Sequence, residues 1–253
     1  AVSRSAAKLL FFTDADCILP RKWISLMSNQ LSANNIDMLC GPVEFKTTKS
    51  FLNNLFRLEF MSLTGSGAAG FFIKKPFMCN GANFSIKAEA YLKNMSSIRD
   101  DFSSGDDVFM LHQISKTGKA DFLLEKDAIV STNSPQSLKE FFLQRIRWAS
   151  KTTGYREPFS LFIAITTFAM SLTLIALLAI AIVYSNFWTL FFIGLGSKTI
   201  ADICLLIPVT KFYRAQKLLL FIPILQVFYP TYIISTAILS LFYKPYWKGR
   251  KIR

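Results

Sequence analysis

The stretch KLLFFTDADC, from Lys8 to Cys17, decides the fold class of this chain. Its first half is a short apolar run of the kind expected of a buried strand, and it ends abruptly in Asp14-Ala15-Asp16. In open α/β sheets, ligands bind beyond the carboxyl ends of the strands, which is where these two carboxylates fall. The stretch therefore predicts an α/β domain with an acidic site at one edge of its sheet.

The residues that follow alternate between helical and extended patterns, as an α/β domain requires. Pro20 to Leu31 predicts a helix, and Met38 to Phe45 predicts a strand broken by Gly41-Pro42. We then expect an amphipathic helix from Phe51 to Leu63 that lies against lipid, and a flexible loop from Gly65 to Gly70. A helix capped by Ser104 should end at Gly118, and a strand should run from Asp121 to Val130. The last expected element of this part is a helix from Ser134 to Ser150, capped by Ser134 with Pro135 at its first position.

The composition shows that a charged globular segment and an apolar segment are joined in one chain. With 52% hydrophobic residues, a net charge of +13 and a mean hydropathy of +0.35, it is too apolar for an ordinary soluble domain and too basic for a neutral membrane bundle. Residues 1–157 hold 20 Lys/Arg against 15 Asp/Glu, whereas residues 158–253 hold 9 against Asp202 alone. The later basic residues border hydrophobic runs, which indicates membrane lipids as partners and argues against nucleic acid. The four cysteines are widely spaced, which argues against structural zinc.

Three hydrophobic segments predict a transmembrane region over residues 158–243, after a catalytic domain over residues 1–157 and before a basic tail over residues 244–253. The expected spans are residues 159–183, 187–209 and 218–243, each long enough to cross a hydrocarbon core. Pro223 and Pro230 are expected to kink or break the third.

The loop charges predict which side of the membrane each connection faces. The turn from Tyr184 to Asn186 is uncharged, whereas Lys211, Arg214 and Lys217 crowd the next loop, so the positive-inside rule places that loop in the cytoplasm. Three full crossings would leave the basic tail outside, against the same rule. We favour a partly re-entrant third segment that returns the tail to the cytoplasm; three plain spans are the alternative.

Two acidic pairs are candidates for chemistry. Asp14 and Asp16 offer hard oxygen ligands for Mg²⁺ or Mn²⁺, although such a pair alone is also typical of a solvated turn. Asp106 and Asp107 stand near the start of a predicted helix, where one carboxylate could act as a general base or where both could be ordinary N-terminal helix charge. The nearby pair Asp100-Asp101 illustrates that second case.

The run QRIRW, from Gln144 to Trp148, offers an amide, two guanidinium groups and an indole. An amide and a guanidinium suit a diphosphate, and an indole suits a sugar ring. Arg and Trp just before a membrane span are equally common as interfacial anchors, so the spacing alone leaves both interpretations open.

Taken in order, TDADC, CNGANF, SGDD, QRIRW and the hydrophobic spans resemble the family 2 glycosyltransferases with a GT-A fold, in the branch of cellulose synthases and ceramide glucosyltransferases. The resemblance implies an inverting transfer of sugar from a nucleotide-diphosphate donor to a lipid or glycan acceptor. The resemblance implies that Asp14 and Asp16 bind the metal and the donor phosphates, and that Asn80, Gly81 and Asn83, in the loop from Cys79, line the acceptor side. It implies that Asp107 is the general base, with Asp106 where Glu is usual. It also implies that Gln144, Arg147 and Trp148 contact the diphosphate and stack on the acceptor.

The same resemblance sets the expected location and the alternatives. The catalytic part is expected at the cytoplasmic face of an integral membrane protein, in the plasma membrane, making a cell-envelope polysaccharide or a glycolipid. A processive polysaccharide synthase is the alternative within the enzyme class, and a non-catalytic transporter or scaffold is the alternative outside it. Because the family's nucleobase-binding first half has no counterpart here, we expect a fragment holding only part of a GT-A domain, inactive by itself.

Two further polar features fall within predicted helices. For His112 we expect a structural role, with a substrate contact as the alternative. Lys198 and Asp202, four residues apart within the second span, are costly in lipid unless they pair or face a wet groove. They are interpreted as a neutralising pair that sets helix packing, with contact to a polar acceptor as the alternative.

Overall fold

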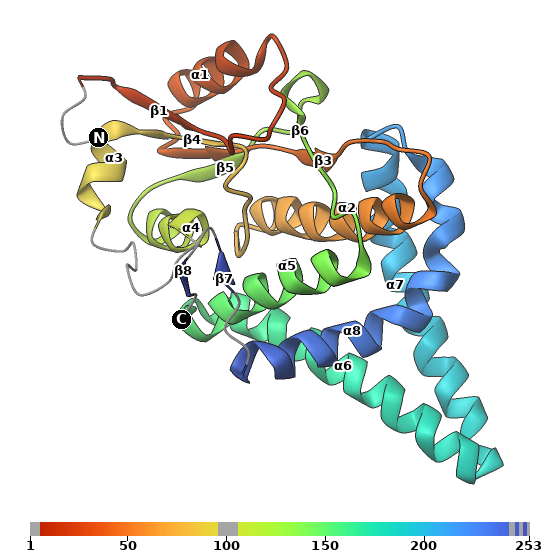
Figure 1. Cartoon of the computed structure of the whole chain (residues 1–253). Helices are drawn as coiled ribbons and strands as arrows, with labels where there is room; N and C mark the ends of the chain where they lie inside the picture. Colours follow the sequence, from red (N-terminus) through yellow and green to blue (C-terminus); the bar gives the residue numbers. More distant parts are fainter. Residues whose placement is uncertain (1–5, 96–105, 243–245, 248–249, 252–253) are drawn as a thin grey trace. The chain divides into compact units, whose positions relative to one another are not determined.

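The computed structural model describes residues 6–95, 106–242, 246–247 and 250–251 (Figure 1). The chain divides into two compact units. The sheet unit comprises Ala1–Thr47 and Leu63–Ser134, and the helical unit comprises Thr48–Ser62 and Pro135–Arg253. These units cut the chain differently from the predicted domain boundary at residue 157, because the QRIRW segment groups with the apolar helices.

The sheet unit is built on a mixed four-stranded sheet, which confirms the α/β class. Its strands, in the order β1, β4, β2, β5, are Leu9–Phe12, Phe84–Lys87, Met38–Cys40 and Ala120–Phe122. β4 is antiparallel to β1 and β2, and β5 is parallel to β2. Phe12, the last residue of β1, lies opposite Phe84, the first residue of β4. The carboxyl ends of β1, β2 and β5 and the start of β4 therefore share one edge.

Helices cover both faces of this sheet (Figure 1). α1 (Trp23–Ala33) lies on one side, and α4 (Asp106–Thr117) lies on the other with Met110, Leu111 and Ile114 in the core. α4 ends as predicted at Gly118, where a Cβ atom would lie 2.4 Å from the Asp37 carboxylate. The Ser104 cap lies outside the described residues, as does Asp100-Asp101. The remaining small elements are α3 (Ala88–Lys93), β3 (Val43–Phe45), β6 (Val130–Thr132) and the 3₁₀ turn η3 (Lys126–Ala128).

The predicted strand from Asp121 to Val130 is wrong in extent. The structure has two short strands there, β5 and β6, with η3 between them. β5 joins the four-stranded sheet, whereas β6 pairs in parallel with β3 in a separate two-stranded sheet. The Gly41-Pro42 break predicted in the earlier strand is confirmed, because β2 and β3 lie on either side of it.

The glycine-rich stretch from Gly65 to Gly70 is not a loop. It lies within one continuous helix, α2 (Phe51–Phe72). Gly67 and Gly70 let the chain after the helix pack closely, since a Cβ atom would lie 3.1 Å from the Met78 carbonyl oxygen at Gly67 and 2.8 Å from the Phe77 ring at Gly70. Packing overrides the low helix propensity of glycine. The expectation that residues 51–63 lie against lipid is also wrong, because residues 55–61 are buried.

The helical unit holds α5 (Leu138–Ser150), α6 (Pro158–Val183), α7 (Trp188–Phe212) and α8 (Ile222–Phe242). Within the described part of the chain, three helical segments are long and apolar enough to cross a membrane: Pro158–Val183, Ser185–Phe212 and Gln216–Phe242. α8 runs along both α5 and α6 (Figure 1). The connections are the 3₁₀ turns η4 (Lys151–Gly154), η5 (Ser185–Phe187) and η6 (Gln216–Phe221), and the tail forms strands β7 (Tyr246–Trp247) and β8 (Arg250–Lys251).

The third apolar segment forms one helix in spite of its prolines. Pro230 lies inside α8 and does not end it. Pro223 is the second residue of the helix, where a backbone N–H has no intrahelical partner in any case. The expected break in this segment is therefore not found.

Replacing Gly70 with Ala tests the close packing of α2 against the chain that follows it. The added methyl would lie 2.8 Å from the Phe77 ring and 3.0 Å from the Lys75 carbonyl oxygen. We expect Gly70→Ala to lower the free energy of unfolding by about 1–3 kcal/mol, measured by thermal unfolding in detergent. Gly196→Ala is the matched control, since a Cβ atom there meets nothing within 4 Å. Equal stability of the two variants would contradict this packing.

Candidate active site

The acidic residues after β1 form a compact cluster in the sheet unit. Single ligand atoms of Asp14, Asp16 and Cys17 all lie within 4.8 Å of one another, and both carboxylates are exposed. The Cys17 amide donates to the Asp14 carbonyl oxygen at 3.1 Å, which closes the turn. Ile18 then exchanges backbone hydrogen bonds with Ser131, at 2.8 and 3.1 Å. The turn is thereby held at the sheet edge.

The donor atoms of this cluster fit a hard divalent cation. Carboxylate oxygens are the ligands that Mg²⁺ and Mn²⁺ prefer. Burial raises the pKa of the Cys17 thiol, and the Asp14 charge adds to this, against opposing hydrogen bonds from Thr132 and Thr13. The thiol therefore stays protonated at neutral pH, where a soft metal would need a thiolate. Asp14 and Asp16 are thus the residues suited to hold Mg²⁺ or Mn²⁺.

The loop from Cys79 to Asn83 enters β4 at the same sheet edge. Asn80 shapes it: its side-chain oxygen accepts from the Ala82 amide at 3.0 Å, and its carbonyl oxygen accepts from the Asn83 amide at 3.0 Å. This is the local hydrogen bonding that makes Asn a turn former. Gly81 lies between them.

Asn83 is fully buried, and its amide group joins three parts of the sheet unit. Its side-chain oxygen accepts from the Trp23 indole at 2.8 Å, and its side-chain nitrogen donates to the carbonyl oxygens of Pro42 and Ala128, at 2.8 and 3.0 Å. Gly41 allows this, since a Cβ atom there would lie 2.5 Å from the same nitrogen. Asn83 therefore secures the loop from inside.

The two carboxylates at the start of α4 face different surroundings. A Cβ atom on Gly81 would lie 3.2 Å from an Asp107 carboxylate oxygen, so Asp107 lies directly against the loop. Asp106 lies near Tyr91, whose pKa is raised by burial and then by the Asp106 charge. The structure thus brings Asp107 together with the Asn80 to Asn83 loop, and it places Asp106 near Tyr91.

His112 has a structural partner within the sheet unit. Its Nε2 lies 3.0 Å from the Phe77 carbonyl oxygen, and because a carbonyl only accepts, Nε2 carries the proton. The side chain is buried. The structural role expected for His112 is consistent with this contact.

The QRIRW segment lies on α5, in the helical unit. The helix is capped by Ser137, whose hydroxyl accepts from the Glu140 amide at 3.2 Å, so the predicted cap at Ser134 is wrong. The Glu140 carboxylate accepts from the Gln136 amide at 2.8 Å, which completes a reciprocal cap. Ser137 with Glu140 three residues later was a readable signal for this start.

Within QRIRW, Arg145 and Ile146 are buried, whereas Gln144, Arg147 and Trp148 are half-buried. Arg145 donates to the Gln144 side-chain oxygen at 2.7 Å, and its guanidinium carbon lies 4.3 Å from the centroid of the Trp148 ring. It also forms an ion pair with Glu59. Sequence reasoning did not single out Glu59, although a charge within an apolar helical segment was a signal for it.

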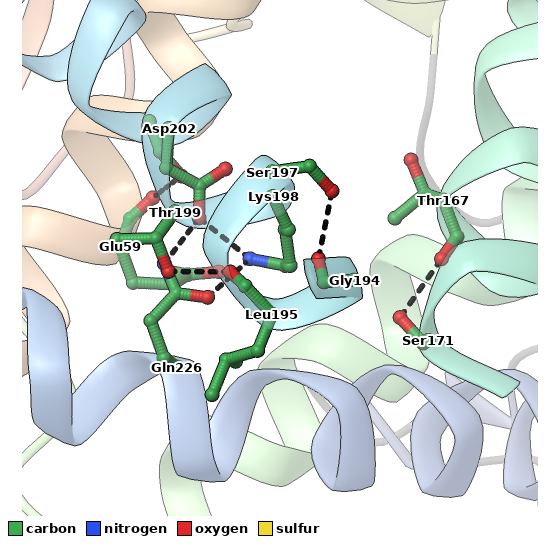
Figure 2. A network of polar contacts seen from close by, with 11 residues as sticks. Glu59, Thr167, Ser171, Gly194, Leu195, Ser197, Lys198, Thr199, Asp202 and Gln226 are labelled. Atoms are coloured by element: carbon green, nitrogen blue, oxygen red, sulfur yellow. Dashed lines mark hydrogen bonds and ion pairs between the residues drawn. The ribbon is translucent and has the colours of Figure 1, made fainter. Parts of the chain in front are cut away.

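Lys198 and Asp202 form the ion pair that their spacing predicts (Figure 2). Lys198 Nζ lies 2.5 Å from Asp202 Oδ2 and donates to Gln226 Oε1 at 2.9 Å, while Gln226 Nε2 donates to Asp202 Oδ2 at 2.6 Å. Lys198 Nζ also lies 4.4 Å from the centroid of the Tyr229 ring. The cluster thereby neutralises both charges between α7 and α8.

A family model described as Glycosyl transferase family group 2 matches residues 9–240, which is most of the chain. The chain belongs to this glycosyltransferase family. No curated protein matches it. Membership establishes sugar transfer as the class of reaction, and it agrees with the mixed α/β sheet followed by long apolar helices. The glycosyltransferase is associated with membranes through those helices.

Titration with Mn²⁺ tests the acidic cluster of this glycosyltransferase. We expect Asp14→Asn and Asp16→Asn each to weaken Mn²⁺ binding by at least about tenfold, the loss typical when even a supporting residue of a metal site is changed. Electron paramagnetic resonance of free Mn²⁺ measures this. Cys17→Ser and Asp127→Asn, which changes an exposed carboxylate paired with Lys22, should bind like the wild type. Unchanged affinity in both aspartate variants would remove the cluster as a metal site.

Proposed function

We propose that the protein transfers a sugar from a nucleotide-diphosphate donor to a lipid or glycan acceptor by a single displacement that inverts the anomeric carbon. The observation that carries this proposal is the gathering of Asp14, Asp16, the Asn80 to Asn83 loop and Asp107 in the sheet unit. The strand ends bring the first two to one edge, and Asp107 lies against Gly81 of the loop. Acidic groups with two different tasks thus share one region.

Asp107 acts as the general base. Its carboxylate lies against Gly81, the residue of the loop without a side chain, so an acceptor hydroxyl can approach it there. Asp107 removes the proton of that hydroxyl as the oxygen attacks the anomeric carbon. Asn80 shapes the acceptor loop, and buried Asn83 holds it in place. Asp106, near Tyr91, serves as a neighbouring charge and not as the base.

Two groups of residues would hold the departing nucleoside diphosphate: carboxylates that act through a metal ion, and cationic or amide side chains that donate hydrogen bonds to it. Asp14 and Asp16 would hold Mg²⁺ or Mn²⁺, which would supply positive charge to the diphosphate. Gln144 and Arg147 contact the diphosphate, and Trp148 offers its ring to the acceptor sugar or lipid headgroup. These assignments rest on residue chemistry and on the order of the motifs.

The catalytic part faces the cytoplasm at the plasma membrane. The uncharged turn between α6 and α7 and the basic loop between α7 and α8 support this orientation. α8 packs along α5 as well as α6, which supports a third segment that returns to the cytoplasmic side. We favour a non-processive enzyme over a processive polysaccharide synthase.

Asp107→Asn tests the proposed mechanism in the full-length protein. The amide keeps the shape of the side chain but removes its basicity, so turnover should fall by about 10²–10⁴-fold while donor binding is retained. Turnover is the release of nucleoside diphosphate from UDP-glucose, UDP-N-acetylglucosamine or GDP-mannose in native membranes, which supply the acceptor. Binding is measured with UDP and GDP by calorimetry.

Asp106→Asn is the matched control for this prediction. It changes the neighbouring carboxylate, which lies near Tyr91, and should lower turnover less. Wild-type turnover in Asp107→Asn would exclude Asp107 as the base and would favour a non-catalytic role for this side chain.

Cysteine labelling tests the orientation of the third apolar helix. In a cysteine-free background, Ser240→Cys near the end of α8 should be protected from a membrane-impermeant maleimide in intact cells and labelled after permeabilisation. Asn186→Cys, in the uncharged turn before α7, should label from outside and serves as the control. Outside labelling of Ser240→Cys would establish three full crossings.

A further inference from the structure

Arg145 connects two of the residues assigned to substrate binding. Its Nη1 donates to the Gln144 side-chain oxygen at 2.7 Å, and its guanidinium carbon lies 4.3 Å from the centroid of the Trp148 ring. The guanidinium therefore contacts both the Gln144 amide and the Trp148 indole. Arg145 is itself 5% exposed, so the orientation of both neighbours depends on where its guanidinium is held.

Glu59, near the middle of α2, holds that guanidinium. Arg145 Nε donates to Glu59 Oε1 at 2.9 Å, and Arg145 Nη2 pairs with Glu59 Oε2. Two parallel bonds of this kind set the plane of the guanidinium as well as its position. Glu59 is 1% exposed, so water does not compete for these bonds.

Tyr232 on α8 completes the arrangement. Its hydroxyl donates to Glu59 Oε1 at 2.8 Å, and its ring stands edge-on to the ring of Phe141, 5.5 Å between centroids. The Arg145 guanidinium also lies 4.6 Å from the centroid of Phe141. Segments of three helices, α2, α5 and α8, thus converge on one buried ion pair within the helical unit.

Burying an ion pair costs free energy, because both charges lose their hydration. Removing two charges from water offsets much of their attraction, and apolar residues of similar volume often stabilise a protein as well or better. Stability alone therefore accounts poorly for Glu59 and Arg145 at this place. Their geometry accounts for it better, because a forked pair defines an orientation that apolar contacts do not.

We propose that Glu59 and Tyr232 are positioning residues that act through Arg145 to orient Gln144 and Trp148 for the donor diphosphate and the acceptor. This inference rests on the proposed function. Neither residue touches substrate; each fixes a side chain that does. A purely structural ion pair makes a different prediction, since its activity and stability would be lost and regained together.

Tyr232→Phe separates positioning from folding with the smallest change. It removes the hydroxyl that bonds to Glu59 and keeps the ring that packs on Phe141. We expect kcat/KM for nucleoside diphosphate release to fall about tenfold. The unfolding temperature should fall by no more than one lost hydrogen bond causes, because Glu59 keeps both of its bonds to Arg145. Tyr229→Phe, on the same helix with its ring 5.2 Å from that of Tyr232, is the matched control and should keep wild-type kcat/KM.

The double variant Glu59→Leu/Arg145→Met also separates positioning from folding, because it should restore stability without restoring the orientation of the side chains. Each single change leaves a buried charge alone and should lower the unfolding temperature, whereas the double change removes both charges and should recover it. We expect kcat/KM to stay low in the double variant, because nothing then orients Gln144 and Trp148. Recovery of kcat/KM together with stability would overturn the proposal.

Fluorine NMR reads the position of Trp148 without any substrate. In protein labelled with 5-fluorotryptophan, the Trp148 resonance is assigned by its loss in Trp148→Phe. It should shift in Tyr232→Phe and in the double variant but not in Tyr229→Phe; an unmoved resonance in both would overturn the proposal. Shifted resonances in a protein that releases no nucleoside diphosphate from any donor would instead refute the proposed function and leave the positioning role intact.

Discussion

A buried ion pair sets the architecture of the helical unit. Glu59 and Arg145 are almost fully withdrawn from solvent, and neither charge is tolerable there without the other. The pair requires α2 and α5 to approach in one register, and the Tyr232 hydroxyl adds α8 to the same point. The face of α5 that carries Gln144 and Trp148 is therefore determined by a contact made on its buried side.

In the sheet unit, a buried neutral side chain, Asn83, has the positioning role that the buried ion pair has in the helical unit. Asn83 is buried with its amide oxygen and nitrogen both bonded, to an indole from α1 and to two backbone carbonyls. This bonding holds the loop that lies against Asp107, while the antiparallel pairing of β1 and β4 brings the loop and the Asp14 turn to one edge. In both units, groups suited to chemistry are exposed or half-buried and are supported by a buried, hydrogen-bonded polar side chain.

The apolar helices carry a third polar cluster, and its contacts explain how a lysine and an aspartate persist there. Lys198, Asp202 and Gln226 satisfy one another, and the Tyr229 ring lies beneath the ammonium group. Tyr229 and Tyr232 are neighbours on α8, with ring centroids 5.2 Å apart. One helix thus packs against the Glu59–Arg145 pair and against the Lys198–Asp202 pair.

Local patterns in the sequence determined the features that depend only on neighbouring residues. The strand before Asp14 follows from its apolar run, the end of α4 from Gly118, and the three membrane-length helices from uninterrupted hydropathy, because each needs nothing distant in the chain. The Lys198 and Asp202 pair was likewise readable, since residues four apart share a helix face.

Only the tertiary structure decided the features that depend on distant partners. Gly65 to Gly70 is helical because Phe77 and Met78 pack where side chains would stand, and glycine composition alone favours a loop. The family resemblance already assigned the base to Asp107, but only the tertiary structure shows that Asp107 lies against Gly81 of the loop. Glu59 acquires its importance from Arg145, 86 residues away, and no local pattern reports a bond across that separation.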